Sequence, residues 1–162
     1  MHDFAIAVTD KPALYRDLAA ALDALTAGEP DPIANMANAA ALIWQYLPDL
    51  NWTGFYRVAG DELVLGPFQG KPACTRIPIG EGVCGAAAAS GEARCVIDVH
   101  DFPGHIVCDA DSAAELVAPV IVEGRVIAVL DLDSPVKGRF DAEDVAGCTA
   151  LAAMLGPRIV ES

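Results

Sequence analysis

The strongest constraint on the fold is a pair of apolar segments, residues 115–122 and 125–133, which are joined by Glu123 and Gly124. A two-residue connection that contains glycine is typical of a tight β-hairpin. The second segment is apolar at every position over residues 126–130, which is typical of a strand buried on both faces. The chain is therefore predicted to fold around a mostly antiparallel sheet in which this second segment is a central strand.

Helical patterns flank the segments predicted as strands. Apolar residues at helical spacing predict an N-terminal helical hairpin over about residues 12–47, and Asp141 is a favourable N-cap for a last helix over about residues 141–155. Further strands are predicted at residues 51–58, 62–65, 74–78 and 93–98, with an alanine-rich helix at about 83–89. This order predicts a single α+β domain over residues 1–162, with the sheet and its pocket within about 51–133.

The charge balance argues against several kinds of partner. The chain carries 10 lysine and arginine residues against 23 aspartate and glutamate residues, a net charge of −13. Because such a field repels phosphate and no basic patch is present, neither a nucleic acid nor an anionic membrane is expected as a partner. The N-terminus does not resemble a signal peptide, and no apolar run reaches the length of a membrane span. A cytoplasmic protein is predicted, in which the five cysteines are expected to be free, catalytic or metal-binding.

Chemically reactive residues concentrate between residues 66 and 109. This stretch holds four of the five cysteines and two of the three histidines, and it is rich in glycine and proline. The spacings of Cys74, Cys84 and Cys108 match neither the Cys-x-x-Cys redox motif nor a zinc ribbon, so any pairing must come from the fold. We interpret these three cysteines as candidates for a nucleophilic thiol and its resolving partners.

A zinc site is the main alternative for this stretch. Two cysteines and two histidines can be combined into a Cys2His2 set, namely Cys84, Cys108, His100 and His105. No pair has the short spacing usual for zinc ligands, so no metal is predicted. The remaining Cys95 and Cys148 match no motif, and we interpret both as structural because free cysteine is commonly buried as a small apolar side chain.

A series of short motifs runs in order along the chain. They are Asn-Trp-Thr-Gly-Phe-Tyr at 51–56, Gly-Pro-Phe-Gln-Gly-Lys at 66–71, Gly-Val-Cys-Gly at 82–85, Asp-Val-His at 98–100, Phe-Pro-Gly-His-Ile-Val-Cys-Asp at 102–109 and Leu-Asp-Leu-Asp-Ser at 130–134. In this order they closely resemble the free methionine-(R)-sulfoxide reductases, small enzymes built on a GAF domain, and the resemblance covers Leu14 to Leu155. It implies a single GAF domain with a mostly antiparallel six-stranded sheet flanked by helices, around a small pocket for free methionine sulfoxide.

The resemblance also implies the roles of individual residues. Cys108 corresponds to the attacking thiol, Cys74 to the thiol that resolves it, and Cys84 to a third, auxiliary thiol. The same matching implies a set of pocket residues, the carboxylates Glu115, Asp131 and Asp133 and the walls Trp52 and Tyr56. The implied reaction reduces free L-methionine (R)-sulfoxide through a sulfenic acid and an intramolecular disulfide, which a thioredoxin-type donor then reduces without any bound cofactor. A homodimer is a further expectation from the family.

The spacing of two carboxylates supports the implied pocket. Asp131 and Asp133 are two residues apart on one predicted strand and so face the same side of the sheet. When carboxylates are held close together, the pKa of one of them rises. One carboxyl of the group could therefore keep a proton and donate it to the sulfoxide oxygen as that oxygen leaves. His105, three residues before Cys108, is a candidate for lowering the pKa of that thiol. Two other functions stay open, a GAF binding module without catalysis and a thiol redox switch. The aromatic residues could also be ordinary core residues, and the two aspartates could simply lie in a solvated turn.

Overall fold

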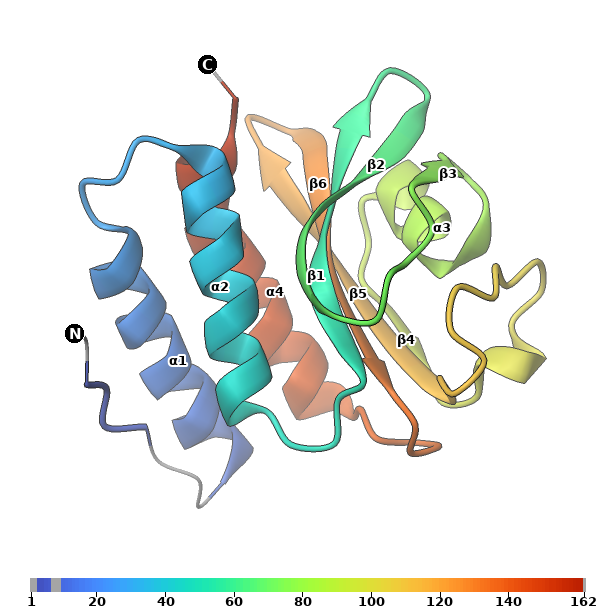
Figure 1. Cartoon of the computed structure of the whole chain (residues 1–162), viewed down its shortest axis with the longest axis horizontal. Coiled ribbons are helices and arrows are strands. Elements are labelled where there is room, and N and C mark those ends of the chain that lie inside the picture. Colours follow the sequence, from blue (N-terminus) through green and yellow to red (C-terminus); the bar gives the residue numbers. More distant parts are fainter. Residues whose placement is uncertain (1–2, 7–9, 162) are drawn as a thin grey trace.

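The computed structural model describes residues 3–6 and 10–161. Along the sequence, two helices precede the first strand and one helix follows the last strand (Figure 1). In chain order the elements are α1 (Lys11–Thr26), α2 (Pro32–Tyr46), β1 (Trp52–Ala59), β2 (Glu62–Gly70), β3 (Arg76–Pro78), α3 (Gly82–Ser90), β4 (Arg94–Val96), the 3-10 helix η1 (Val99–Asp101), β5 (Ala114–Val122), β6 (Arg125–Ser134) and α4 (Ala142–Ile159).

The strands form one six-stranded sheet in the order β3-β2-β1-β6-β5-β4, and every neighbouring pair is antiparallel. β6 lies between β1 and β5, which confirms the prediction of a central strand for this apolar segment. Glu123 and Gly124 form the turn between β5 and β6, and both adopt a positive φ that suits a tight hairpin connection. The predicted α+β fold with a mostly antiparallel six-stranded sheet is therefore confirmed.

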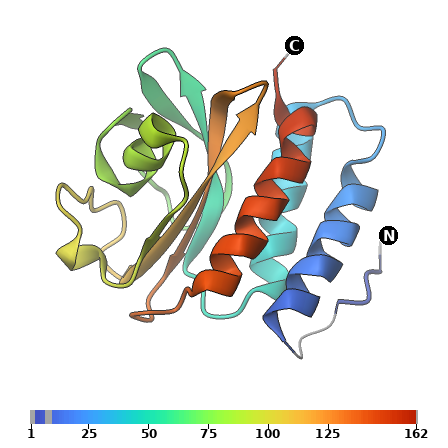
Figure 2. The same cartoon turned by 180° about the vertical axis from the view of Figure 1, so that it is seen from behind.

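The sheet separates two apolar layers. Figures 1 and 2 show α2 and α4 covering one face, with α1 packed against both of them on the side away from the sheet, while α3 and the long connections lie on the other face. Leu116, Leu130 and Leu132 point into the core beneath the three long helices, whereas Val117 and Val129 pack on the side of α3. Because side chains alternate along a strand, every second position of β5 and β6 faces α3. That alternation decides which polar residues of these strands enter the second layer.

The helices begin at aspartates and are held by their apolar faces. Asp10 and Asp31 accept hydrogen bonds from backbone N–H groups in the first turns of α1 and α2. Asp141 caps α4, which runs to Ile159 and so extends past the predicted end near residue 155. Pro157 lies in the last turn of α4, and the helix continues past it to the buried Ile159, which packs into the core. Among the helices in residues 10–161, none has both the length and the apolar character needed to cross a membrane.

β2 is longer than the predicted strand, which ended at residue 65. It continues to Gly70, and its register with β1 shifts between Gly54 and Tyr56, where two residues of β2 oppose one of β1. This bulge accommodates Pro67, which lies beyond the short stretch where β2 pairs with β3. Although the local sequence around Pro67 suggests the end of a strand, β2 continues through this proline.

Candidate active site

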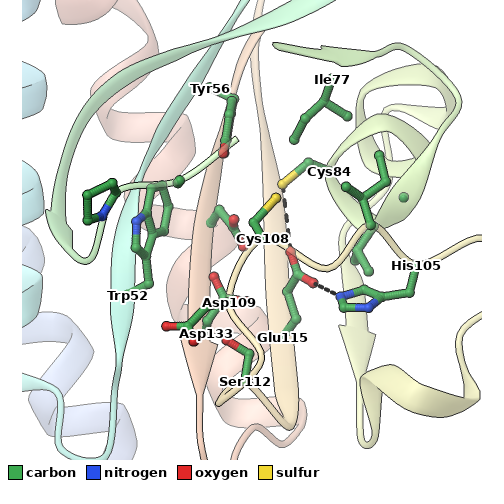
Figure 3. A pocket seen from close by; sticks show the side chains of 16 residues that line it. Trp52, Tyr56, Ile77, Cys84, His105, Cys108, Asp109, Ser112, Glu115 and Asp133 are labelled. Carbon is green, nitrogen blue, oxygen red and sulfur yellow. Dashed lines mark hydrogen bonds and ion pairs between the residues drawn. The ribbon is translucent and has the colours of Figure 1, made fainter. Parts of the chain in front are cut away.

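A pocket lies in the second layer, between the sheet and α3 (Figure 3). Seven of the residues predicted for a site line it, namely Trp52, Tyr56, Cys84, Cys108, Glu115, Asp131 and Asp133. The other lining residues are Pro72, Ala73, Ile77, Gly82, Val83, His105, Ile106, Asp109 and Ser112. Of the predicted site residues only Cys74 is absent from the lining, and it is joined to the pocket by a covalent bond.

That bond is a disulfide between Cys74 and Cys108, two residues 34 positions apart in the sequence. Cys74 lies in the connection between β2 and β3, and Cys108 in the long connection before β5. The Tyr56 hydroxyl donates a hydrogen bond of 2.9 Å to the carbonyl oxygen of Cys74. Lys71 and Asp111, 2.7 Å apart, form an ion pair between the same two connections. The fold therefore brings together the attacking and resolving thiols that the resemblance implies.

The three predicted carboxylates meet near the end of the sheet where β5 begins and β6 ends. Asp131 and Asp133 share the pocket side of β6, and Glu115 of β5 is the direct cross-strand partner of Asp133. Glu115 and Asp131 are buried, and Asp133 is half-buried. Burial and then the neighbouring Asp133 and Glu115 carboxylates raise the pKa of Asp131 well above its usual value. Burial and the Glu115 carboxylate raise the pKa of Asp133 in the same way. The group thus favours a bound proton or a cation.

Cys84 and His105 approach the same cluster from either side. The Cys84 thiol, on the first turn of α3, lies 3.7 Å from Glu115 Oε1. Burial, followed by Asp131 and Glu115, raises the pKa of that thiol well above its usual value. His105 Nε2 lies 3.6 Å from the other oxygen, Glu115 Oε2 (Figure 3). The sequence suggested His105 as a partner of Cys108, but the structure pairs its ring with Glu115.

Aromatic side chains build one wall of the pocket. The Trp52 ring stacks on Tyr56 at a centroid distance of 5.8 Å and on Phe68 at 5.2 Å. Trp52 also donates a hydrogen bond of 3.2 Å from Nε1 to the carbonyl oxygen of Lys71. Sequence reasoning did not single out Phe68, although it lies within the Gly-Pro-Phe-Gln-Gly-Lys motif. Its stack on Trp52 holds the wall in place.

A second polar contact that sequence reasoning missed lies beside Cys108. Asp109 and Ser112 line the pocket, and the Asn51 amide donates to Asp109 Oδ2 at 3.3 Å and to Ser112 Oγ at 3.0 Å. Asn51 and Asp109 both belong to the quoted motifs, so the motifs were the signal that could have found them. These bonds connect the start of β1 to the connection that carries Cys108.

The remaining cysteines and the Cys2His2 alternative lie elsewhere. His100 is exposed and contacts Asp98 at 2.8 Å, and Cys108 is held in the disulfide, so the four residues of that set do not converge as free ligands. Cys148 is fully buried beneath the long helices, as expected for a structural residue. Cys95 is exposed, so its interpretation as a buried apolar side chain is wrong. The cause is the position of β4, which is a short edge strand.

Comparisons with known proteins place these features in a family context. Residues 31–159 match the GAF domain family. The free methionine-R-sulfoxide reductase of Escherichia coli is 51% identical over 146 residues, which cover 90% of this chain and 88% of that protein. The yeast (Saccharomyces cerevisiae) protein of the same name is 37% identical over 159 residues, covering 93% of this chain and 88% of that protein. The X-ray structure of the Neisseria meningitidis free methionine-R-sulfoxide reductase in complex with its substrate has a TM-score of 0.94 at 44% identity, and the match covers 98% of this chain and 96% of that one.

Proposed function

The chain belongs to the GAF domain family and within it to the free methionine-R-sulfoxide reductases, and on that premise we propose that it reduces free L-methionine (R)-sulfoxide with its own thiols. The observation that carries the proposal is the Cys74–Cys108 disulfide beside a pocket with buried carboxylates. This disulfide is the oxidised form that such a reaction leaves behind. The roles of individual residues in this reaction and in substrate binding are part of the proposal.

The first chemical step takes place at Cys108. Its thiolate attacks the sulfoxide sulfur, and as the sulfur–oxygen bond of the substrate breaks the oxygen passes to the Cys108 sulfur. The products are methionine and a Cys108 sulfenic acid, with no bond left between the two sulfurs. A carboxyl group of the Glu115, Asp131 and Asp133 cluster supplies the proton that the oxygen takes up. The raised pKa values of Asp131 and Asp133 support this role, because burial and the neighbouring carboxylates favour the protonated form of each carboxyl.

The second step returns the sulfenic acid to the disulfide state. The Cys74 thiol displaces the hydroxyl of the Cys108 sulfenic acid, which releases water and forms the sulfur–sulfur bond. The hydrogen bond from Tyr56 to the Cys74 carbonyl favours a fixed position for this thiol. A dithiol of the thioredoxin type then supplies two electrons and two protons, so that both thiols are restored. We assign the auxiliary role to Cys84, whose thiol lies 3.7 Å from Glu115 Oε1 and takes no part in the disulfide.

Substrate choice follows from burial and charge. A free amino acid brings an ammonium group that the buried Asp131 and its neighbours can neutralise, whereas a residue within a peptide has no charge at that nitrogen. The apolar wall of Trp52 and Tyr56 suits the methyl and methylene groups beside the sulfoxide. The same wall provides a surface that can distinguish the two configurations at sulfur. We therefore assign the five pocket residues of the sequence prediction to substrate binding.

Turnover of three substrates tests the proposed function. Purified protein with thioredoxin, thioredoxin reductase and NADPH should oxidise NADPH with free methionine (R)-sulfoxide and not with the (S) epimer or a peptide-bound sulfoxide. Failure with all three substrates, repeated with a small dithiol as donor, would favour a GAF binding module that lacks catalysis.

A single-turnover experiment separates the roles of the two cysteines. Pre-reduced Cys74→Ser should still form about one methionine per chain, because the attack does not need the resolving thiol. Pre-reduced Cys108→Ser should form none, with Cys95→Ser as a matched control that behaves like the wild type. Full product from Cys108→Ser would show that another thiol attacks.

Three further features complete the proposal. The chain lacks a Cys-x-x-Cys motif of its own, which favours a separate thioredoxin-type protein as the reductant. The reaction needs reduced thiols, which is in keeping with a cytoplasmic location. We extend the expected homodimer from the family to this chain, and sedimentation of the purified protein tests it directly.

A further inference from the structure

Three potential metal ligands meet inside the pocket, and each comes from a different element. The Cys84 sulfur from α3, a carboxylate oxygen of Glu115 from β5 and one of Asp131 from β6 all lie within 4.8 Å of one another. Figure 3 shows the side chains of Cys84 and Glu115 pointing toward each other. The sequence has no short ligand spacing here because strand pairing and helix packing bring the three residues together.

The separation of Cys84 and Glu115 suits a tetrahedral ion. An ion about 2.3 Å from a sulfur and about 2.1 Å from an oxygen holds these two ligand atoms about 3.6 Å apart in a tetrahedron. The distance from Cys84 Sγ to Glu115 Oε1 is 3.7 Å. The first two ligands therefore need almost no movement to enclose such an ion.

An unpartnered oxygen supplies independent support. Asp131 is only 5% exposed, it lines the pocket, and its Oδ1 has no hydrogen-bond partner among residues 3–6 and 10–161. A buried acceptor of this kind is rare unless a proton, water or cation satisfies it. The same carboxylate supplies one of the three ligand atoms of the cluster beside Cys84 and Glu115.

Glu115 is also oriented in the way that a metal ligand requires. Its Oε1 faces Cys84, while its Oε2 is held 3.6 Å from His105 Nε2. Ligating carboxylates commonly have a polar neighbour beside their second oxygen, and His105 lies in that place.

We propose that Cys84, Glu115 and Asp131 form a binding site for a zinc ion, with the fourth coordination position toward the pocket. Zinc accepts thiolate and carboxylate ligands together, whereas magnesium and calcium take oxygen ligands. Binding replaces the Cys84 thiol proton, which leaves to solvent, and no electron is transferred.

A consequence for activity rests on the proposed function. The carboxylates that hold the ion are the ones assigned to the substrate ammonium, so zinc and free methionine sulfoxide exclude each other. Zinc is then a reversible inhibitor that acts on the pocket and leaves the Cys74–Cys108 pair untouched.

Binding to the oxidised protein tests the site. In this form Cys74 and Cys108 are blocked by their disulfide, so a zinc titration against a chromophoric chelator should show one ion per chain. Cys84→Ser should weaken binding more than about tenfold, since loss of even an indirect partner of a metal costs 10–100-fold. Cys95→Ser, which removes an exposed thiol elsewhere, should bind zinc like the wild type. Cobalt should give a thiolate charge-transfer band in the wild type that Cys84→Ser lacks.

A second variant covers the case in which Cys84→Ser does not fold. Asp131→Asn keeps the size of the side chain and should also weaken zinc binding more than about tenfold. Unchanged zinc affinity in folded Cys84→Ser or Asp131→Asn, or a cobalt complex without a thiolate band, would overturn the site.

Competition separates this inference from the proposed function. The Cys74→Ser/Cys108→Ser variant cannot turn over, so free methionine sulfoxide stays intact during the titration. Increasing concentrations of free methionine sulfoxide should weaken zinc binding to this variant. Tight zinc binding that methionine sulfoxide does not affect would keep the metal site and refute the assignment of the substrate ammonium to these carboxylates.

Discussion

Gly54 is the residue whose replacement most directly tests how the pocket wall is built. It lies on β1 opposite Phe68 of β2 on one side and Asp131 of β6 on the other. A Cβ at this position would lie 2.3 Å from the Phe68 Cβ and 2.7 Å from the Pro67 carbonyl oxygen. Carbon atoms pack best at about 3.5–4.0 Å, so the two strands would have to separate by more than about 1 Å.

The cost of Gly54→Ala follows from this contact. Overpacking of a core costs about 1–3 kcal/mol, and a backbone contact between two paired strands belongs at the upper end of that range. With a urea m-value of about 2 kcal/mol/M, a loss of about 3 kcal/mol lowers the unfolding midpoint by about 1.5 M. Because Phe68 stacks on Trp52, the KM for free methionine sulfoxide should also rise.

Urea unfolding followed by circular dichroism measures the stability change, and initial rates measure the KM. The matched control is Gly54→Ala in a Phe68→Gly background, where the nearest carbon is absent. There the added cost of Gly54→Ala should be at least about 1 kcal/mol smaller, because contacting residues couple in double-mutant cycles. A loss below about 1 kcal/mol for Gly54→Ala, with an unchanged KM, would refute the reasoning.

Two further predictions concern thiol reactivity and pH. In the native oxidised protein a maleimide should label the exposed Cys95, although burial and then Asp144 raise the pKa of its thiol. The fully buried Cys148, whose thiol pKa burial raises to about 12, should react only after unfolding. Mass spectrometry of the labelled peptides checks this, and equal rates for the two thiols would contradict it. The hydrogen bond from Lys11 lowers the pKa of Asp141 from 3.8 to about 2. The ionised Asp141 carboxylate therefore stabilises the protein above about pH 4, and this contribution is lost as the pH falls toward 2. Asp141→Asn should therefore unfold at lower urea than the wild type at pH 7 and at the same urea near pH 2, and a pH-independent gap would exclude this ion pair as the cause.

Local patterns predicted the long elements of the fold. Helical spacing of apolar residues and the N-cap aspartates decide where α1, α2 and α4 begin, because both act within a few residues of sequence. The continuous apolar run of β6 predicted a central strand for the same reason. The end of β2 could not be predicted in this way, since the bulge that accommodates Pro67 exists only through pairing with β1.

For the site, the sequence by itself predicted a set of residues of which seven line the pocket, and it determined that Asp131 and Asp133 share one face, because alternation along a strand is a local property. Only the tertiary structure decided that Glu115 lies opposite Asp133, that Cys74 bonds to Cys108, and that Cys84 reaches the carboxylates. The physical reason is that strand register and helix placement are settled by packing across the whole sheet. No short stretch of the chain contains the information that brings these groups within a few ångströms of one another.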